Sequence, residues 1–173
     1  MTMKKMKLWS LALLAAMMLL PHTVMADDSG TCGENLTWTY SEANNTLTIE
    51  GTGKMNNYDS NEVPWYLQRN YIKKIIIGPG VTSIGSFAFY GCSSANYLYL
   101  SNSVTTINTG AFWGCTGLTS ITIPNSVTTI GTSAFRICTG LTSITIPNSV
   151  TAIGEYNQEI KGETNVEIIP VIA

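Results

Sequence analysis

Apolar residues recur along this chain at a fixed spacing, and this pattern is the most informative feature of the sequence. Residues 118–131 read LTSITIPNSVTTIG and residues 141–154 read LTSITIPNSVTAIG, an offset of 23 positions. The same offset aligns paired Ile or Leu residues, an Ala-Phe pair and a single cysteine. The aligned residues are Ile75/Ile77, Leu98/Leu100, Ile121/Ile123 and Ile144/Ile146; Ala88-Phe89, Ala111-Phe112 and Ala134-Phe135; and Cys92, Cys115 and Cys138. Such a repeat predicts a solenoid, in which each copy stacks on the next.

The first segment of each repeat alternates between apolar and polar residues. Ile121 and Ile123 are predicted to point inward, while Ser120 and Thr122 point outward, because successive side chains of a strand face opposite sides. The equivalent outward positions of all repeats form one solvent-facing surface. Its predicted residues are Lys74, Ile76, Tyr97, Tyr99, Ser120, Thr122, Ser143 and Thr145.

The remainder of each repeat predicts a second short strand and a turn. Pro124 ends the first strand because proline cannot donate a ladder hydrogen bond. Residues 127–130 form the second extended segment, and Gly131 permits a tight bend after it. The stretch x-x-Ala-Phe-x-x-Cys then has the length of a short helical or 3₁₀ turn across the back of the stack. One equivalent position on this back is occupied by Tyr90, Trp113 and Arg136.

The motif ITIPNSVTTIG-x-x-AF-x-x-C resembles the BspA-type leucine-rich repeat of bacterial surface antigens, and the resemblance covers residues 75–154. It implies a mostly β, right-handed leucine-rich-repeat solenoid, exported or exposed at the surface. It also implies a family associated with adhesion and with binding of host or neighbour-cell macromolecules. The family brings no catalytic residues to transfer onto this sequence.

A solenoid needs its two open ends covered, and the N-terminal end predicts a β-hairpin cap. Leu36, Trp38 and Tyr40 alternate with polar residues, as do Leu47 and Ile49 across the polar segment 41–45. We expect the apolar face of this hairpin, together with Met55 and Trp65, to cover the first strand at Ile75.

The C-terminal end keeps the spacing but loses the core residues. Residues 166–170 follow residues 143–147 by 23 positions. The core positions of this copy are occupied by Asn157, Gln158, Lys161 and Thr164. One hypothesis is a degenerate capping repeat whose strand still pairs; the alternative is the frayed tail of a truncated array. Glu167 would point inward in strict register, so either the strand slips by one residue or the edge is loose.

These patterns give four segments. Residues 1–26 carry Lys4, Lys5 and Lys7 before an apolar run and close on a small-x-small cleavage site, which predicts a secretory signal peptide. Residues 27–73 are the hairpin cap, residues 74–154 the repeats, and residues 155–173 the degenerate capping repeat or tail. Signal cleavage removes the sole histidine, His22, and moves the net charge from -2 to -5, with 6 basic and 11 acidic residues left.

This composition excludes several function classes. Without histidine, the mature chain has no imidazole base and no histidine-containing zinc site or catalytic triad. Its charge does not favour nucleic-acid binding. The acidic residues of the cap (Glu34, Glu42, Glu50, Asp59 and Glu62) are not paired by any pattern in the sequence, so we expect no enzyme, no cofactor and no metal site.

The three aligned cysteines predict a ladder of buried free thiols. Equivalent positions in stacked strands lie about 4.7–4.9 Å apart, so distance alone does not exclude a disulfide. Three in a column leave one unpaired, however, and a small buried cysteine packs as a hydrophobic residue. The spacing lacks the short pairs of a metal site. The state of Cys32 is open from sequence.

The repeats are almost uncharged, because Arg136 is the only Lys, Arg, Asp or Glu between residues 75 and 154. Their Thr- and Ser-rich surface is either β-forming filler or a neutral hydroxyl face that can dock a partner without desolvating charges. Tyr97 and Tyr99 stand out on this surface, since tyrosine is enriched at interfaces. The alternative is that both tyrosines pack under the N-terminal cap.

The sequence therefore predicts an exported, non-enzymatic binding or adhesion module for an extracellular protein or glycan. The alternative is a structural spacer of the cell envelope without a specific ligand. No cysteine directly follows the apolar signal core, so the sequence does not support a lipid anchor, and neither a second membrane span nor a wall-sorting motif precedes Ala173. We expect a secreted or surface-located protein, either released, periplasmic or held by a partner.

Overall fold

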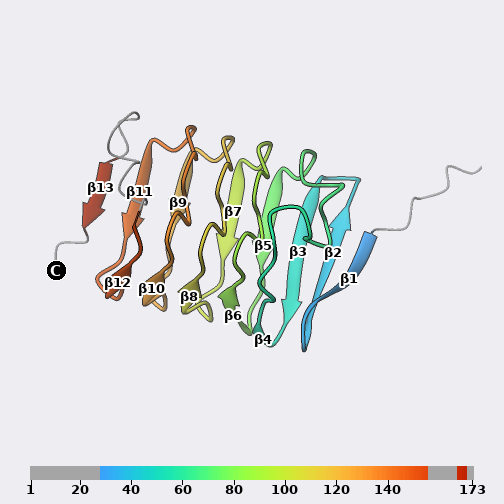
Figure 1. Ribbon diagram of the computed structural model, residues 1–173, viewed down its shortest axis with the longest axis horizontal. Helices are drawn as coiled ribbons and strands as arrows, with labels where there is room; N and C mark the ends of the chain where they lie inside the picture. Colours follow the sequence, from blue (N-terminus) through green and yellow to red (C-terminus); the bar gives the residue numbers. More distant parts are fainter. Residues whose placement is uncertain (1–27, 156–166, 171–173) are drawn as a thin grey trace, which may run out of the picture.

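The computed structural model describes residues 28–155 and 167–170, and its elements are strands joined by turns. Parallel strands from successive repeats lie side by side along the long axis of the molecule (Figure 1). The strands are β1 Asp28–Gly33, β2 Leu36–Ser41, β3 Thr46–Gly51, β4 Gly53–Lys54, β5 Lys74–Ile77, β6 Val81–Ile84, β7 Tyr97–Leu100, β8 Thr106–Ile107, β9 Ser120–Thr122, β10 Thr129–Ile130, β11 Ser143–Ile146, β12 Ala152–Ile153 and β13 Glu167–Pro170.

Each repeat contributes a first strand to one side of the stack and a second strand to another, and the second strand has two residues in every repeat except in β6, which has four. The second strands form one sheet in the order β12-β10-β8-β6-β4. The first strands and the cap strands form two sheets, β1-β2-β3-β5-β7 and β13-β11-β9, so the hydrogen-bonded ladder is interrupted between β7 and β9. We call the side formed by β3, β5, β7, β9 and β11 the strand wall.

The predicted alternation holds in the middle of the strand wall and weakens in β11, where Ser143, Thr145 and Ile146 are all half-buried. In β9, Ile121 is buried, whereas Ser120 and Thr122 are exposed. The equivalent pairing of β9 with β11 is in register, Ile121 opposite Ile144. Eight residues of this repeat are buried: Leu118, Ile121, Ile123, Val127, Ile130, Ala134, Phe135 and Cys138.

The turns on the back contain no helix within the described residues, so the prediction of short helical or 3₁₀ turns is wrong there. Every second backbone N–H group of the turn donates a hydrogen bond to the next repeat. Phe87, Phe89 and Gly91 donate to carbonyls of that repeat, at 2.8–3.0 Å. The N–H groups between them bond back within the turn, as Tyr90 does to Phe87. Left-handed backbone at Phe87 and Gly91 (φ 53° and 69°) produces this alternation, which a continuous helix cannot accommodate.

A column of stacked aromatic rings fills the interior behind these turns. Phe89 stacks on Phe112 at 5.2 Å between ring centroids, and Phe112 stacks on Phe135 at 5.5 Å. Trp65 extends the column, 5.5 Å from Phe89, and its Nε1 donates to the carbonyl of Ala88. All four rings are 0–1% exposed, so the column forms the continuous centre of the core.

The N-terminal segment contains the predicted hairpin and also the first repeat of the stack. β2 and β3 pair antiparallel, with Trp38 opposite Ile49, as the sequence predicted. β3 in addition pairs parallel with β5, and β4 pairs parallel with β6. Residues 46–73 therefore continue the stack and do more than cover it. The sequence did not reveal this because Leu47 pairs with Ile75, 28 positions later, and tryptophan replaces phenylalanine in the ring column.

A further strand, β1, covers the edge of this first repeat. It pairs antiparallel with β2 and carries an irregularity between Thr31 and Gly33. Its carbonyl at Cys32 accepts hydrogen bonds from the Asn56 N–H and the Tyr58 hydroxyl. These bonds hold β1 over the edge at β4. The sequence of β1 has no apolar alternation, so pattern alone did not predict it.

At the other end, β13 pairs parallel with β11, with Glu167 opposite Ser143 and Ile168 opposite Ile144. This is the one-residue slip, one of the two arrangements expected from sequence. Pro170 lies in this edge strand, a position where proline is tolerated. The signal peptide and most of the predicted capping repeat fall in 1–27, 156–166 and 171–173, outside the described residues; the handedness and the domain boundaries stay predictions.

Candidate binding surface

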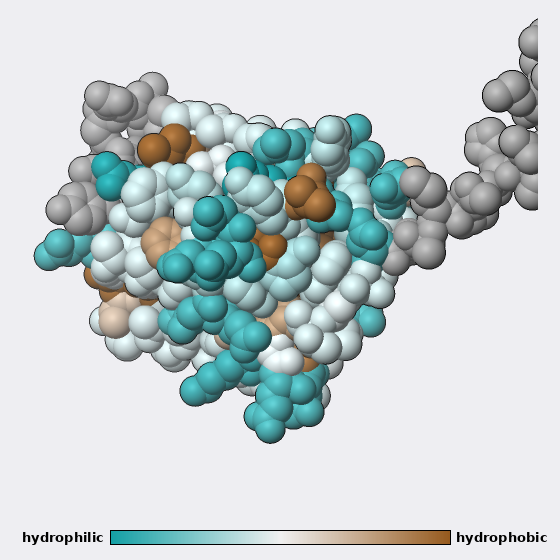
Figure 2. Space-filling view, turned by 45° about the vertical axis from the view of Figure 1, so that its right-hand side comes forward, coloured by the Kyte–Doolittle hydropathy of each residue, from teal (hydrophilic) through white to brown (hydrophobic). Residues whose placement is uncertain are grey.

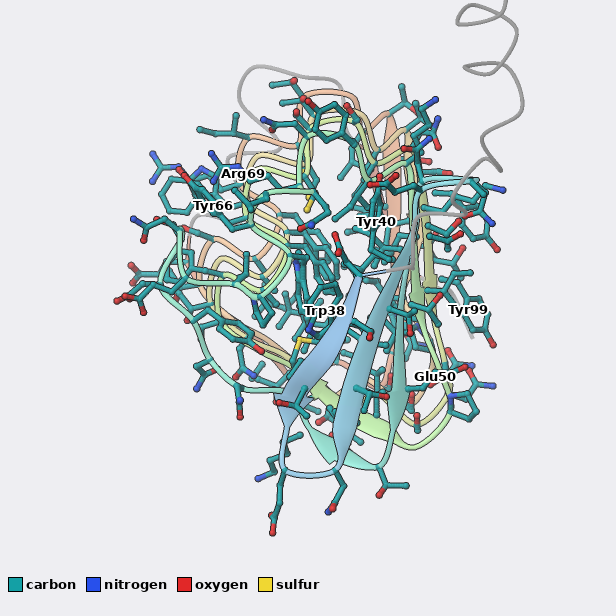
Figure 3. All side chains as sticks on the ribbon, turned by 90° about the vertical axis from the view of Figure 1, so that its right-hand side faces the viewer. Trp38, Tyr40, Glu50, Tyr66, Arg69 and Tyr99 are labelled. Carbon is teal, nitrogen blue, oxygen red and sulfur yellow. The ribbon has the colours of Figure 1, made fainter. Side chains whose placement is uncertain are left out.

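The predicted site residues lie in two rows on the outer side of the strand wall. Parallel pairing places Lys74 opposite Tyr97 and Ile76 opposite Tyr99, so these four side chains share one face. The rows continue in register from Ser120 to Ser143 and from Thr122 to Thr145. Figure 3 shows Tyr99 on the outside of the strands, with Trp38 in the interior.

The predicted site residues on this face differ in their exposure to solvent. Tyr97 and Tyr99 are 51% and 48% exposed. Lys74, Ser120 and Thr122 are also exposed, while Ser143 and Thr145 are half-buried. Ile76 was expected to be exposed but is half-buried. It lies between Thr48 on β3 and Tyr99 on β7, which flank it in register and reduce its contact with water.

The two tyrosines do not pack under the N-terminal cap. The sheet order places β3 and β5 between β7 and the hairpin strand β2. Strand β5 therefore separates both rings from the cap hairpin β2–β3, and both rings remain open to solvent. This removes the packing alternative that the sequence left open.

The structure extends this face in a way that the sequence did not predict. Thr48 continues the row of Ile76 onto β3, and Thr39 on β2 pairs with Thr48. The interruption between β7 and β9 lies beside the two tyrosines, and Leu98, next to it, is half-buried while its equivalents Ile75 and Ile144 are buried. Strand periodicity carries no information on such a break, since the two strands have the expected patterns.

The surface is predominantly polar, with small separate hydrophobic groups on the face shown in Figure 2. On the opposite side of the stack from Tyr99, Figure 3 shows Tyr66 and Arg69 among the turns. There Tyr90 and Trp113 lie 5.9 Å apart between ring centroids, and the Arg136 guanidinium lies 4.9 Å above the Trp113 ring. Tyr90, Trp113 and Arg136, which were predicted to occupy the equivalent position of three successive repeats, therefore lie next to one another on the back of the stack.

All four cysteines are free and buried, which confirms the predicted thiol ladder and gives the state of Cys32. The thiols of Cys115 and Cys138 donate to the carbonyls of Phe89 and Phe112, at 3.2 and 3.1 Å. Burial raises the pKa of Cys32, Cys92 and Cys138 to about 12 and that of Cys115 well above its ordinary value. The thiols are protonated at neutral pH and are therefore poor nucleophiles.

The part of the chain that the structure describes holds no group of three or more His, Cys, Asp or Glu side chains placed to bind a metal ion. No helix in that part is long and apolar enough to cross a membrane.

Comparisons with known proteins agree with this architecture. A leucine-rich repeat protein from Eubacterium ventriosum ATCC 27560 superposes with a TM-score of 0.60 and 26% identity, over 74% of this chain and 40% of that one. A leucine rich cell surface protein from Faecalibacterium prausnitzii A2-165 gives 0.63 and 24%, over 82% and 39%. The leucine rich repeat protein of T. pallidum gives 0.53 and 20%, over 72% and 64%. This chain spans less than two thirds of each of these proteins. None of the curated proteins matches it.

A protein-family model also matches the repeat array. Six copies of the BspA type leucine rich repeat region match residues 66–168, which is more than half of the chain. The match extends past the region of obvious repeats on both sides, into the first repeat and into β13. By sequence and by fold, this protein belongs to the BspA-type leucine-rich-repeat family.

Proposed function

We propose that this protein is an exported, non-enzymatic binding module that docks an extracellular protein or glycan on the outer face of its strand wall. The observation that carries the proposal is the pair Tyr97 and Tyr99, which are 51% and 48% exposed on one short strand. Exposed aromatic rings two residues apart present a flat apolar area that the Ser and Thr residues of the other repeats lack.

The surroundings of the pair favour docking at low cost. Ser120 and Thr122 supply hydroxyl groups beside it, and Lys74 is the one charged residue among the eight predicted site residues. Desolvating a neutral hydroxyl surface costs less than desolvating charges, so such a face can bind without compensating ion pairs. Export is supported by the signal-like residues 1–26 and by the description of the Faecalibacterium relative as a cell surface protein.

Replacing both tyrosines tests the proposal. We expect Tyr97→Ser/Tyr99→Ser to weaken binding of the labelled protein to intact cells or extracellular matrix at least tenfold, because truncating central interface aromatics costs about 2 kcal/mol or more. Flow cytometry and solid-phase binding measure this loss. Tyr71→Ser is the matched control, since Tyr71 is 66% exposed and lies outside the strands of the wall. Unchanged binding by the double variant, with unfolding temperatures equal to wild type, would favour the spacer alternative.

The exported location is tested separately by cell fractionation. We expect the chain lacking residues 1–26 in the medium or at the cell surface, measured by immunoblot and by mass spectrometry of the N-terminus. Recovery of the intact chain from the cytosol would contradict export.

A further inference from the structure

The hydrogen-bonded ladder of the strand wall stops at one interface, between β7 and β9, which we call the seam. The β3–β5 and β5–β7 interfaces each hold four register pairs, and the β9–β11 interface holds three. No register pair joins β7 to β9 in the part of the chain that the structure describes, although β9 follows β7 in the row of strands in Figure 1. The seam therefore differs from its neighbouring interfaces in the wall.

The backbone hydrogen bond that precedes each first strand is also missing at the seam. The Asn96 N–H donates to the carbonyl of Lys73 at 3.0 Å, and the Thr142 N–H donates to the carbonyl of Thr119 at 3.2 Å. Thr142 also donates its hydroxyl to that carbonyl, at 3.1 Å. Thr119 occupies the same position at the seam but makes neither bond to Asn96 within the described residues. The loss of pairing therefore extends beyond the two strands.

The sequence of the repeat before the seam accounts for weaker packing there. Ala95 occupies the core position that Leu118 and Leu141 occupy in the next two repeats, and its side chain is much smaller. Leu98 on β7 is half-buried, while Ile75 at the equivalent position is buried. A smaller core side chain offers fewer van der Waals contacts to the next repeat. The seam therefore lacks the ladder hydrogen bonds and also part of the packing that joins the other repeats.

The other two sides of the same interface are closed. In the sheet of second strands, β8 pairs with β10 in register, and the Gly131 N–H donates to the carbonyl of Ile107 at 2.7 Å. On the turn side, formed by the turns on the back of the stack, the Phe112 N–H donates to the carbonyl of Ala134 at 2.8 Å. The rings of Phe112 and Phe135 stack there with an angle of 2° between their planes. These contacts join the two repeats along one side and leave the strand wall free to open.

We propose that the solenoid is hinged at the seam. The strand wall opens between β7 and β9, and the second strands and turns of the same two repeats form the hinge. Opening the seam breaks no ladder hydrogen bond among the described residues, whereas opening β5 from β7 or β9 from β11 breaks several. The seam is therefore the interface that opens at the lowest free energy.

The hinge divides the face that carries the predicted site residues. Tyr97 and Tyr99 lie on one edge of the seam, and Ser120 and Thr122 lie on the other, so opening changes the separation of the two groups. A face that changes its curvature in this way can fit partners of different shape. This consequence rests on the proposed function, whereas the hinge itself does not.

Distances between pairs of spin labels test the hinge. The native thiols are buried, so the labels react with introduced surface cysteines. Thr48→Cys/Thr145→Cys places labels on β3 and β11, across the seam. Thr39→Cys/Tyr99→Cys is the matched control, because it spans β2 to β7 on the same wall without crossing the seam. Double electron–electron resonance should give a distance distribution about twice as broad for the first pair as for the second.

A third pair separates a hinge from general loosening of the interface. Thr82→Cys/Thr151→Cys spans β6 to β12 on the side of the second strands, and we expect a distribution as narrow as that of the control pair. An equally narrow distribution across the seam would show a static break and overturn the proposal. An equally broad distribution in either of the other pairs would also overturn it, because the motion would not be confined to an opening wall. No partner takes part in these measurements, so their outcome is independent of the proposed function.

Discussion

The two sides of this solenoid are built by different means. On the strand wall, Ile121 and Ile144 face inward and Ser120 and Thr122 face outward, so strand alternation sets the direction of each side chain. On the turn side, left-handed residues and alternating hydrogen bonds between repeats set the path of the backbone. The strand wall therefore tolerates exchange of its outward residues, while the turn side is constrained at single positions. Substitutions on each side can test that contrast.

Loss of a ring from the interior column should have the largest effect. Phe112 is fully buried between Phe89 and Phe135. We expect Phe112→Ala to lower the free energy of unfolding by about 3–5 kcal/mol, measured by urea denaturation, because it opens a cavity that the stacked repeats cannot close. On the strand wall, Thr122→Ala should change it by about 0.5 kcal/mol or less. Similar losses for the two variants would contradict the contrast.

A smaller but still clear effect is expected from a single added methyl group on the turn side. Gly110 has a φ of 60°, and its Cβ would lie 2.5 Å from the Phe87 ring. Gly110→Ala should therefore cost about 1–3 kcal/mol in the free energy of unfolding, from backbone strain and displacement of that ring. The control is Gly91→Ala, which has the same strain (φ 69°) but open space, and should cost less. An equal loss of unfolding free energy in Gly110→Ala and Gly91→Ala would contradict a contribution from the contact with Phe87.

Alkaline pH should destabilise the turn side through its buried thiols. Burial raises the pKa of Cys92 in the folded state from 9.0 to about 12. A group with a raised pKa contributes its full stability below the unfolded value and loses it as pH rises through the folded value. Each such thiol should thus cost about 1 kcal/mol by pH 10. Urea denaturation at pH 7 and pH 10 measures this loss, and Cys92→Ala should reduce it; an unchanged difference would count against a buried neutral thiol.

The sequence was most informative where the repeat is regular. The strands, the buried Phe and Cys columns and the outward rows of the strand wall all follow from one apolar period. It was least informative at the ends and on the turns. The sequence predicts the first repeat only as part of a cap, because its offset and its ring residue differ from those of the later repeats, and it predicts no strand over Asp28–Gly33, which shows no apolar pattern. Ile76 was expected to be exposed because alternation gives the direction of a side chain and does not show what flanks it.

By itself, then, the sequence determined the repeat family, the register of the strands within the regular repeats and the identity of the core there, because a period of apolar residues can be satisfied only by stacking copies of one unit. Only the tertiary structure decided which outward residues remain open to solvent, where the ladder breaks beside Tyr97 and Tyr99, and how Phe87 and Trp113 come together on the turns. These features depend on neighbours one or two repeats away and on backbone angles, and neither leaves a period in the sequence.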